Sequence, residues 1–518
     1  MGSILPGNLD LITTLASHCL QRTTESVQQT QVTLRQAIQP LPPGFPPGPD
    51  GDVALELAQN PLQCLESLKS RYGGLVGFKL ASRPIVLVSS PAFAREVFVN
   101  QSSIFIKAGT AFFPGSSLAG NGLLVSDGDI WKRQRRLSNP AFRKAAIQTY
   151  AEAMVNITEK MVKNTWRTGG VRDVYADFNE LTMKIVASAL FGADEGSENL
   201  AQVGPAITQA FQFFTRRATS MFIVPEWIPT FDNIQYNSAV TGLNKVVYRL
   251  IDERRSQLAG SSGSKKKDLL TRLLQATDDD GSGMDDQSLR DELMTLLVAG
   301  QETSAILLTW ALLMFALHPH TQELVFQEVS EVLGGQPPRQ SDVSKLKYLE
   351  SFIWETLRLM PPAYVVGRCA CRSTELGGYQ VPEGTTMLVS PYLLHRDPAF
   401  WPRALEFDPS RWMPGGDAKE HMENDSFWPY GGGPRNCIGM GFAMMEVTLV
   451  LATITSRFRV SLPSGNSIPS PRAMITLRPE NQVNLRLTPR RQPKQQTPGS
   501  SFNVKQYDSQ DRREVSVL

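Results

Sequence analysis

Cysteine and histidine are scarce in this sequence. Its 518 residues include only five cysteines and five histidines. An odd and widely spaced set of cysteines argues against a disulfide framework. The two histidines of His318-Pro-His320 lack a helical i, i+4 spacing and a nearby acidic or thiol partner, which disfavours a zinc enzyme.

The chain also lacks a strong excess of charge and a long apolar run near its start. The formal net charge is +2 and the pI is about 8.2, so we expect no nucleic-acid partner. A membrane-spanning helix needs about 20 apolar residues. The apolar stretch of residues 11–20 is shorter and is interrupted by polar side chains. We therefore predict no spanning segment there.

Composition divides the chain into four parts. Residues 1–38 are rich in Ser, Thr and Gln, which predicts a leader that is either a transit peptide or disordered. Residues 39–51, QPLPPGFPPGPDG, read as a Pro/Gly linker. Residues 52–488 form the expected catalytic domain. The polar residues 489–518 are expected to be a disordered tail.

Within the expected domain, helical patterns dominate. Residues 74–90 alternate around a central turn and predict a β-hairpin. Residues 129–330 are mostly helical, with a flexible loop near 259–267, and residues 288–319 predict a long helix in the core because they are apolar on most sides. Short β-like segments follow residue 364. The fold class predicted is mainly α with small β-sheets.

The segment FWPYGGGPRNCIG, residues 427–439, contains the strongest chemical signal. Its glycines permit positive φ and a close approach of the backbone to a flat partner. Cys437 stands just before a run with helical periodicity, where free N–H groups favour a thiolate. A thiolate facing a flat partner suggests an axial haem ligand. Arg435 is placed to meet an anionic edge of that partner.

This segment resembles the signature of the cytochrome P450 haem-thiolate monooxygenases, an aromatic residue followed by Gly-x-Gly-x-Arg-x-Cys-x-Gly. The resemblance covers roughly residues 40–490 and departs at Tyr430, where Phe is usual. It implies the family's fold, with the long helix crossing the haem, and heme b (iron protoporphyrin IX) as cofactor. It also implies Cys437 as the iron ligand. The other residues of this segment that it assigns to the cofactor are Gly431, Gly433, Arg435 and Gly439.

A second set of matches implies further cofactor contacts and a structural clamp. Trp131 and Arg135 lie at i, i+4 in WKRQR, and by resemblance both reach a haem propionate, as does Arg368. Glu355 and Arg358 lie at i, i+3 on one helical face and can form an ion pair. By resemblance, Arg411 completes a clamp that serves folding and haem retention. Basic residues near position 132 suggest a surface for an acidic electron donor.

The segment AGQETS, residues 299–304, places small and polar residues in the long apolar helix. The residues alone fit either a packing notch with a satisfied carboxylate or a catalytic site. The resemblance favours the second, with Glu302 and Thr303 guiding protons to dioxygen during its cleavage. The implied reaction is RH + O2 + 2e⁻ + 2H⁺ → ROH + H2O. A haem-thiolate isomerase or dehydratase is a competing function, although such relatives tend to lack the acid–Thr pair.

Within the family, the chain most resembles the plant and algal carotenoid-ring hydroxylases. That resemblance implies a hydrophobic substrate, O2, and ferredoxin or NADPH-cytochrome P450 reductase as electron donor. It also implies a membrane-associated plastid location, with endoplasmic reticulum or cytoplasm as alternatives. Gln301 stands where that branch usually has His, and fatty-acid or other lipid hydroxylation is the alternative activity. The apolar residues 221–231 fit either a loop that dips into a membrane surface or one that packs on the core.

Overall fold

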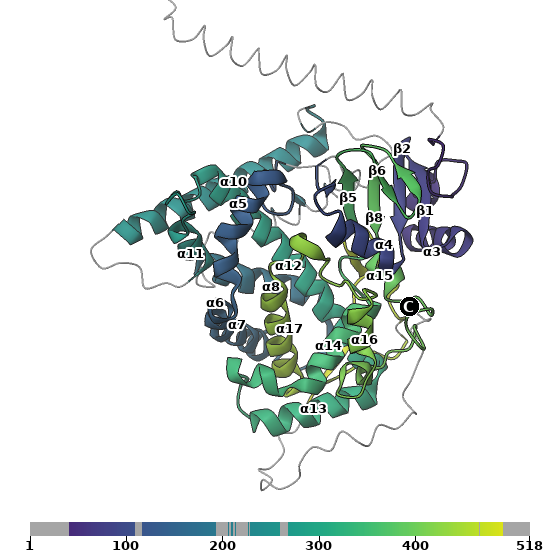
Figure 1. The fold of residues 1–518 in the computed structure, drawn as a ribbon. Coiled ribbons are helices and arrows are strands. Elements are labelled where there is room, and N and C mark those ends of the chain that lie inside the picture. The colour runs from purple at the N-terminus through teal and green to yellow at the C-terminus, as the bar shows by residue number, and fades with distance from the viewer. Residues whose placement is uncertain are drawn as a thin grey trace, which may run out of the picture.

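The computed structural model describes residues 41–108, 117–192, 228–259 and 268–490 without residue 466, and isolated residues between 206 and 226. The predicted leader falls outside the described residues, as do nearly all of the loop 259–267 and the tail after residue 490. Most of the apolar segment 221–231 also lies outside them. Figure 1 shows a body of helices with a sheet at one side. The predicted fold class, mainly α with small β-sheets, is confirmed.

The sheet at that side has five strands in the order β1-β2-β8-β5-β3. The predicted hairpin forms its first two strands, which pair antiparallel through a turn with positive φ at Ala81 and Ser82. Strand β8 lies parallel to β2, and the other pairs are antiparallel. The strands are β1 (Leu75–Leu80), β2 (Arg83–Val88), β3 (Phe105–Ile106), β5 (Val366–Ala370) and β8 (Thr386–Val389).

Residues 45–48 of the predicted linker pack against β1. Phe45 is buried, and the N–H of Gly77 donates to the carbonyl of Pro47 at 2.9 Å. Two short helices precede the first hairpin in the chain, α2 (Ala54–Gln59) and α3 (Pro61–Tyr72), and one follows it, α4 (Pro91–Arg95). A single turn of π-helix, η1 (Glu96–Asn100), comes next. Such turns often occur at functional sites.

The helical region confirms the pattern expected for residues 129–330, apart from the short strand β4 (Gly170–Asp173). The helices from α5 to α14 that the structure describes pack into the body shown in Figure 1. They are α5 (Gly128–Ser138), α6 (Lys144–Ile147), α7 (Ala151–Asn164), α8 (Val174–Phe191), α10 (Phe231–Ala259), α11 (Leu269–Gln275), α12 (Asp286–Leu317), α13 (Pro319–Leu333) and α14 (Lys347–Leu359).

The long central helix α12 is the predicted core helix. The Asp285 side chain caps it by accepting the N–H of Ser288 at 2.7 Å, and Pro319 prevents its continuation. The helix packs on α8, α10, α14 and α17 (Met440–Thr455), and most of its side chains are buried. By length and composition it could cross a membrane, but burial within the protein accounts for its apolar character.

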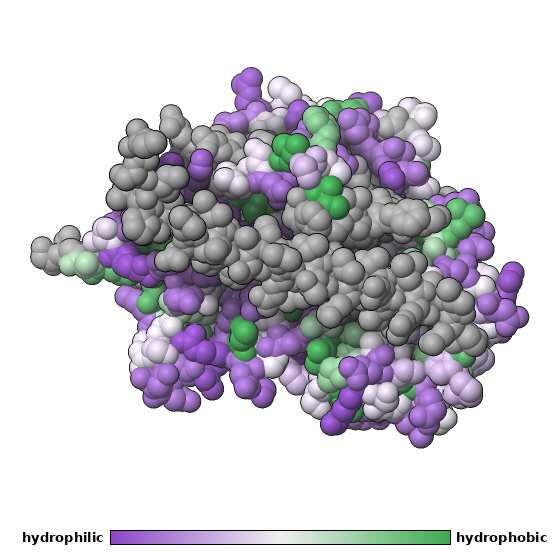
Figure 2. Space-filling view, turned by 90° about the horizontal axis from the view of Figure 1, so that it is seen from above, coloured by the Kyte–Doolittle hydropathy of each residue, from purple (hydrophilic) through white to green (hydrophobic). Residues whose placement is uncertain are grey.

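The C-terminal part consists of short elements that surround the cysteine segment. Its 3₁₀ turns are η4 (Gln340–Lys345), η5 (Pro409–Trp412) and η6 (Gly433–Arg435), while η2 (Asn139–Phe142) and η3 (Gln148–Tyr150) lie between α5 and α7. The remaining elements are β6 (Thr374–Leu376), β7 (Tyr379–Val381), α15 (Pro391–Leu394), α16 (Ala418–Glu423), β9 (Phe458–Ser461), β10 (Pro471–Ala473), β11 (Leu477–Pro479) and β12 (Asn484–Pro489). Strands β4, β12 and β9 form a second sheet, and β6-β7 and β10-β11 are hairpins. Among the coloured residues in Figure 2, most of those at the surface are hydrophilic, with small separate hydrophobic areas.

Candidate active site around Cys437

The cysteine segment folds as a tight loop that leads into α17. Gly431 and Gly433 have φ values of 67° and 64°, in the left-handed region that favours glycine. The N–H of Cys437 donates to the carbonyl of Tyr430 at 2.9 Å, which closes the loop. The Cys437 side chain remains exposed. The backbone therefore presents this sulfur to whatever the loop binds.

The glycines of the loop serve two different purposes. A Cβ on Gly433 would come within 1.9 Å of the Phe98 carbonyl oxygen, so this glycine allows the loop to press against η1. A Cβ on Gly431 would meet no atom within 4 Å, and one on Gly439 would lie 3.8 Å from the Cys437 sulfur. The space beside Gly431 and Gly439 agrees with clearance for a flat partner, whereas Gly433 is required by protein packing.

The expected preference of Cys437 for the thiolate does not hold in the protein alone. Surrounding protein raises the pKa of its thiol because desolvation disfavours the charged form. The N–H groups of Gly439 and Met440 and the charge of Arg135 act in the opposite direction but are outweighed. The helix N-terminus and Arg135 therefore offset only part of the desolvation of the thiol.

Behind the loop lies the predicted clamp. Glu355 and Arg358 are fully buried, with an N–O distance of 2.8 Å, and Arg358 also donates to three backbone carbonyls. Arg411 lies 3.5 Å from Glu355, and the carboxylate also accepts the indole N–H of Trp412 at 2.9 Å. Nearly every polar atom of this pair is satisfied, which offsets the desolvation cost of burying both charges.

Aromatic side chains and a neutral histidine connect the clamp to the loop. The Trp354 ring on α14 packs edge-on against the Tyr430 ring, with centroids 6.1 Å apart. The backbone N–H of Trp428 donates to His395 Nε2 at 2.8 Å. Burial lowers the pKa of His395 to about 3, and the nearby Arg358 charge adds to this effect. The imidazole is therefore neutral and can accept this hydrogen bond.

The predicted cationic residues meet on the side of the loop facing the five-stranded sheet. The Arg435 guanidinium lies 4.4 Å from the Trp131 ring centre and is paired with Asp127. Arg135 donates to the backbone and side-chain oxygens of Asn436, at 2.8 and 3.0 Å. Arg368 on β5 is 3% exposed and lies against the Phe98 ring. The structure thus brings together Trp131, Arg135 and Arg435, and brings Arg368 to the same cluster.

Lys107 belongs to this cluster, although no sequence motif pointed to it. Burial lowers its pKa well below the usual value, and the charges of Arg368 and Arg435 lower it further. Burial likewise lowers the pKa of Arg368 to about 10. Lys107 follows β3, whose pairing with β5 brings together residues more than 260 positions apart in the chain. Only the sheet register places Lys107 near Arg368.

This cluster carries more positive than negative charge. The positive charges of Lys107, Arg368 and Arg435 lie close enough to affect one another. Asp127 is the acid whose negative charge acts on all three. The Asp127 carboxylate also accepts two backbone N–H groups of residues 107 and 108, so its capacity is shared. Like charges in a low-dielectric site are unfavourable unless an anion binds between them. The cluster therefore fits a bound anion.

The segment 299–304, which the sequence analysis assigned to catalysis, lies in the middle of α12. The Thr303 hydroxyl donates to the Ala299 carbonyl at 2.7 Å, and a Cβ on Gly300 would lie 3.1 Å from Val186 of α8. Glu302 is 6% exposed, and burial raises the pKa of its carboxyl. Its nearest cation is Arg478 of β11, at 3.8 Å. Glu302 and Thr303 are adjacent but have different partners.

Gln301 makes its contacts with α8. Its side chain donates to the Asn179 side-chain oxygen at 2.8 Å, and its carbonyl accepts the Thr182 hydroxyl at 2.9 Å. Both partners lie on α8, so Gln301 joins two helices.

A match to a known family indicates which cofactor these residues bind. A family model described as cytochrome P450 matches residues 42–485. The chain belongs to the cytochrome P450 family. Members of this family carry a haem iron and act as monooxygenases, so this cytochrome P450 is a haem-dependent monooxygenase.

Three relatives indicate the breadth of the match. Cyclooctatin synthase of Streptomyces melanosporofaciens is 37% identical over 432 residues, covering 83% of this chain and 92% of the relative. Cyclooctat-9-en-7-ol 5-monooxygenase of the same organism is 34% identical, covering 80% and 88%. The chloroplastic protein LUTEIN DEFICIENT 5 of Arabidopsis thaliana is 29% identical, covering 82% and 73%. The carotenoid branch is therefore one of several similar groups.

The residues of this cytochrome P450 fit a haem. Cys437 offers an accessible sulfur, the positions of Gly431 and Gly439 leave room beside it, and the cationic cluster suits the carboxylates of a porphyrin. The clamp and its aromatic neighbours hold the loop in shape. In the part of the chain that the structure describes, no cluster of His, Cys, Asp and Glu offers a competing metal site.

The predicted donor-binding surface is partly neutralised. Arg133 and Arg136 lie 3.4 and 2.5 Å from Asp278, in the acidic turn that precedes α12. Lys132 pairs with the neighbouring Asp129 at 3.1 Å. The sequence separation between residues 136 and 278 concealed this pairing. A docking surface for an acidic donor would depend more on exposed residues outside these pairs, such as Arg143 and Lys144.

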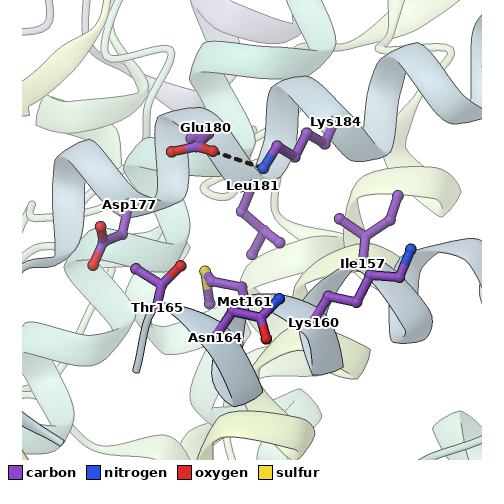
Figure 3. Close-up of a pocket in the computed structure, with 9 residues that line it drawn as sticks. All are labelled: Ile157, Lys160, Met161, Asn164, Thr165, Asp177, Glu180, Leu181 and Lys184. Atoms are coloured by element: carbon purple, nitrogen blue, oxygen red, sulfur yellow. Dashed lines mark hydrogen bonds and ion pairs between the residues drawn. The ribbon is translucent and has the colours of Figure 1, made fainter. Parts of the chain in front are cut away.

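A surface pocket between α7 and α8 lies apart from these residues. Figure 3 shows Lys184 paired with Glu180 at one side of it and Asp177 at another. Its lining residues are Ile157, Lys160, Met161, Asn164, Thr165, Asp177, Glu180, Leu181 and Lys184. None of them is a predicted site residue. We assign no role in catalysis to this pocket.

Proposed function

We propose that this cytochrome P450 hydroxylates a ring C–H bond of an unsaturated, ring-containing hydrocarbon. The observation that carries this proposal is the 37% identity to cyclooctatin synthase across 92% of that protein. The second relative is named for an alkene that bears a hydroxyl group, and for insertion of oxygen at its carbon 5. A substrate of this kind offers the site few polar groups, so shape complementarity would select it.

Carotenoid-ring hydroxylation is a second candidate within the same chemical class. It is supported by the similarity to LUTEIN DEFICIENT 5 over 82% of this chain, at 29% identity. A plastid location belongs to this candidate. Fatty-acid or other lipid hydroxylation is the third candidate, and the experiment below distinguishes all three.

The roles of the residues follow from their surroundings. We assign Cys437 to the iron and propose heme b as the cofactor, with its two carboxylates facing the cations Lys107, Arg368 and Arg435. When bound, the haem activates O2 with two electrons from a ferredoxin or a flavin reductase. Glu302 and Thr303 then supply protons from α12, where the Glu302 carboxyl is largely buried.

The test is incubation of the full-length holoenzyme with a ferredoxin, its reductase and NADPH, in parallel with cytochrome P450 reductase and NADPH. The substrates offered separately are pentalenene as a ring alkene, β-carotene and a long-chain fatty acid. We expect a hydroxylated ring alkene by mass spectrometry, with one oxygen from labelled O2. Hydroxylated carotene alone would favour the second candidate, and hydroxylated fatty acid alone would overturn both ring candidates.

A further inference from the structure

The environment of Glu302 includes a side chain that the sequence did not associate with it. Arg478 Nη1 lies 3.8 Å from Glu302 Oε1. The Thr476 side chain hydrogen-bonds to the same carboxyl group. Both partners come from the hairpin β10-β11, which follows α12 by more than 150 residues. The carboxyl is therefore held by a distant element and not by its own helix.

The hairpin is anchored at Leu477, the residue between Thr476 and Arg478. Leu477 is fully buried; its N–H donates to the Pro362 carbonyl at 2.9 Å and its carbonyl accepts the Trp310 indole N–H at 3.0 Å. The second bond fixes the Leu477 backbone against α12, because Trp310 lies on that helix. Thr476 and Arg478 flank this anchor and both reach Glu302.

Polar side chains of α8 extend this contact toward the surface. Asn179 accepts a hydrogen bond from Gln301, and Tyr175 lies within hydrogen-bonding reach of both Asn179 and Arg478. Tyr175 and Asn179 are partly exposed, and 26% of the Arg478 side chain is exposed, compared with 8% for Glu302. We call Tyr175, Asn179 and Arg478 the polar seam. It runs between α8 and the hairpin, from solvent to a buried carboxyl.

The charge of Glu302 depends on this seam. Burial raises the pKa of the carboxyl, while the Arg478 charge and the Thr476 hydrogen bond lower it. At 3.8 Å and with one partner partly exposed, the ion pair is loose enough for water to compete with it. A carboxyl that is balanced in this way can exchange protons without losing its position.

We propose that Arg478 is a positioning residue for Glu302 and that the polar seam is the route by which Glu302 exchanges protons with bulk water. The proposal rests on the proposed role of Glu302 in supplying protons. Each proton that the carboxyl releases toward O2 is replaced by one from water through the seam, so Glu302 returns to its starting state. Thr303, at the next position of α12, is held by Ala299 and is independent of the hairpin.

The first measurement follows the protonation of Glu302 without turnover. In the full-length holoenzyme, the infrared C=O stretch of the protonated carboxyl is identified by its loss in Glu302→Gln and titrated against pH. Arg478→Gln should move the titration to higher pH because an opposing positive charge is removed, and Arg478→Lys should largely restore it. Arg472→Gln is the matched control. Arg472 lies opposite Arg478 in the register of the two strands, but its side chain is exposed. An unchanged titration in Arg478→Gln would overturn the contact.

The second measurement tests the route. Arg478→Gln should lower product formed per O2 consumed by about tenfold and increase peroxide release, less severely than Glu302→Gln, whose loss should be about a hundredfold. The solvent isotope effect on product formation should rise in Arg478→Gln and in Tyr175→Phe but not in Arg472→Gln.

Equal coupling in wild type and Arg478→Gln would refute the proposal. A wild type that oxidises none of the substrates would instead refute the proposed function, and the infrared titration would still decide the contact.

Discussion

The two sides of the candidate site are built in different ways. The cysteine side, comprising the loop 427–439 with α14 and the cationic cluster, draws its key residues from short sequence motifs. The α12 side, comprising residues 299–304 with α8 and the hairpin β10-β11, is completed by contacts between segments far apart in the chain. The first holds a cofactor by rigid support and fixed charge. The second contains a buried carboxyl whose protonation can change.

The largest effect expected from a substitution is on the cysteine side. Glu355→Ala leaves Arg358 buried without its carboxylate, which should cost about 3–5 kcal/mol of unfolding free energy. Glu350→Ala on the same helix is the control, because its pair with Lys347 is partly exposed and contributes at most about 1 kcal/mol. Chemical denaturation of both variants measures the difference. Equal losses would show that the clamp does not support the fold.

The cysteine side could be predicted because its residues are close together in sequence and chemically specific. The turn glycines, Arg435, Cys437 and the Glu355–Arg358 pair are each visible in a short window, and the buried helix 288–319 followed from its composition. Lys107 and Arg478 could not be predicted, since each depends on strand pairing or hairpin placement across the chain. The contact of Gln301 with Asn179 could not be predicted either, because Asn179 lies on another helix.

On the α12 side, the Thr303 hydroxyl is the group to remove. Thr303→Val keeps the shape but eliminates the hydrogen-bonding group, so product per O2 should fall by about tenfold or more while O2 consumption continues. Thr303→Ser retains the hydroxyl and should remain near wild type. Oxygen uptake, peroxide and product are measured together. Unchanged coupling in Thr303→Val would exclude a role for this hydroxyl in proton supply.

Lys107 tests the meaning of the cationic cluster. Lys107→Met removes one of the mutually repelling charges, so the haem-free protein should be no less stable, whereas haem affinity should fall by about tenfold. Lys132→Met, at an exposed pair, serves as the control. Haem transfer to an acceptor protein gives the affinity, and thermal unfolding gives the stability. Unaltered haem affinity in Lys107→Met would remove this residue from the cofactor site.

Glu446 connects the two sides, and its expected effect is a pH dependence of the unfolding free energy. It lies on α17, accepts the Ser304 hydroxyl at 2.6 Å, and burial raises its pKa to about 8. A carboxyl with a raised pKa stabilises the fold below its unfolded pKa of about 4.3 and loses that contribution as pH rises toward about 8. Unfolding free energy should therefore fall by up to about 1.4 kcal/mol per pH unit in that window. Glu446→Gln should flatten this slope, and an identical slope would show that Glu446 does not titrate there.

The central claim is that Cys437 binds a haem iron through its sulfur, with the cationic cluster holding the carboxylates. The most direct test is the carbon monoxide difference spectrum of the reduced full-length protein. The account predicts the long-wavelength Soret band that thiolate-bound haem gives with carbon monoxide, and its loss in Cys437→Ser at equal folded content. A wild-type spectrum without that band, or a Cys437→Ser variant that retains it, would contradict the account.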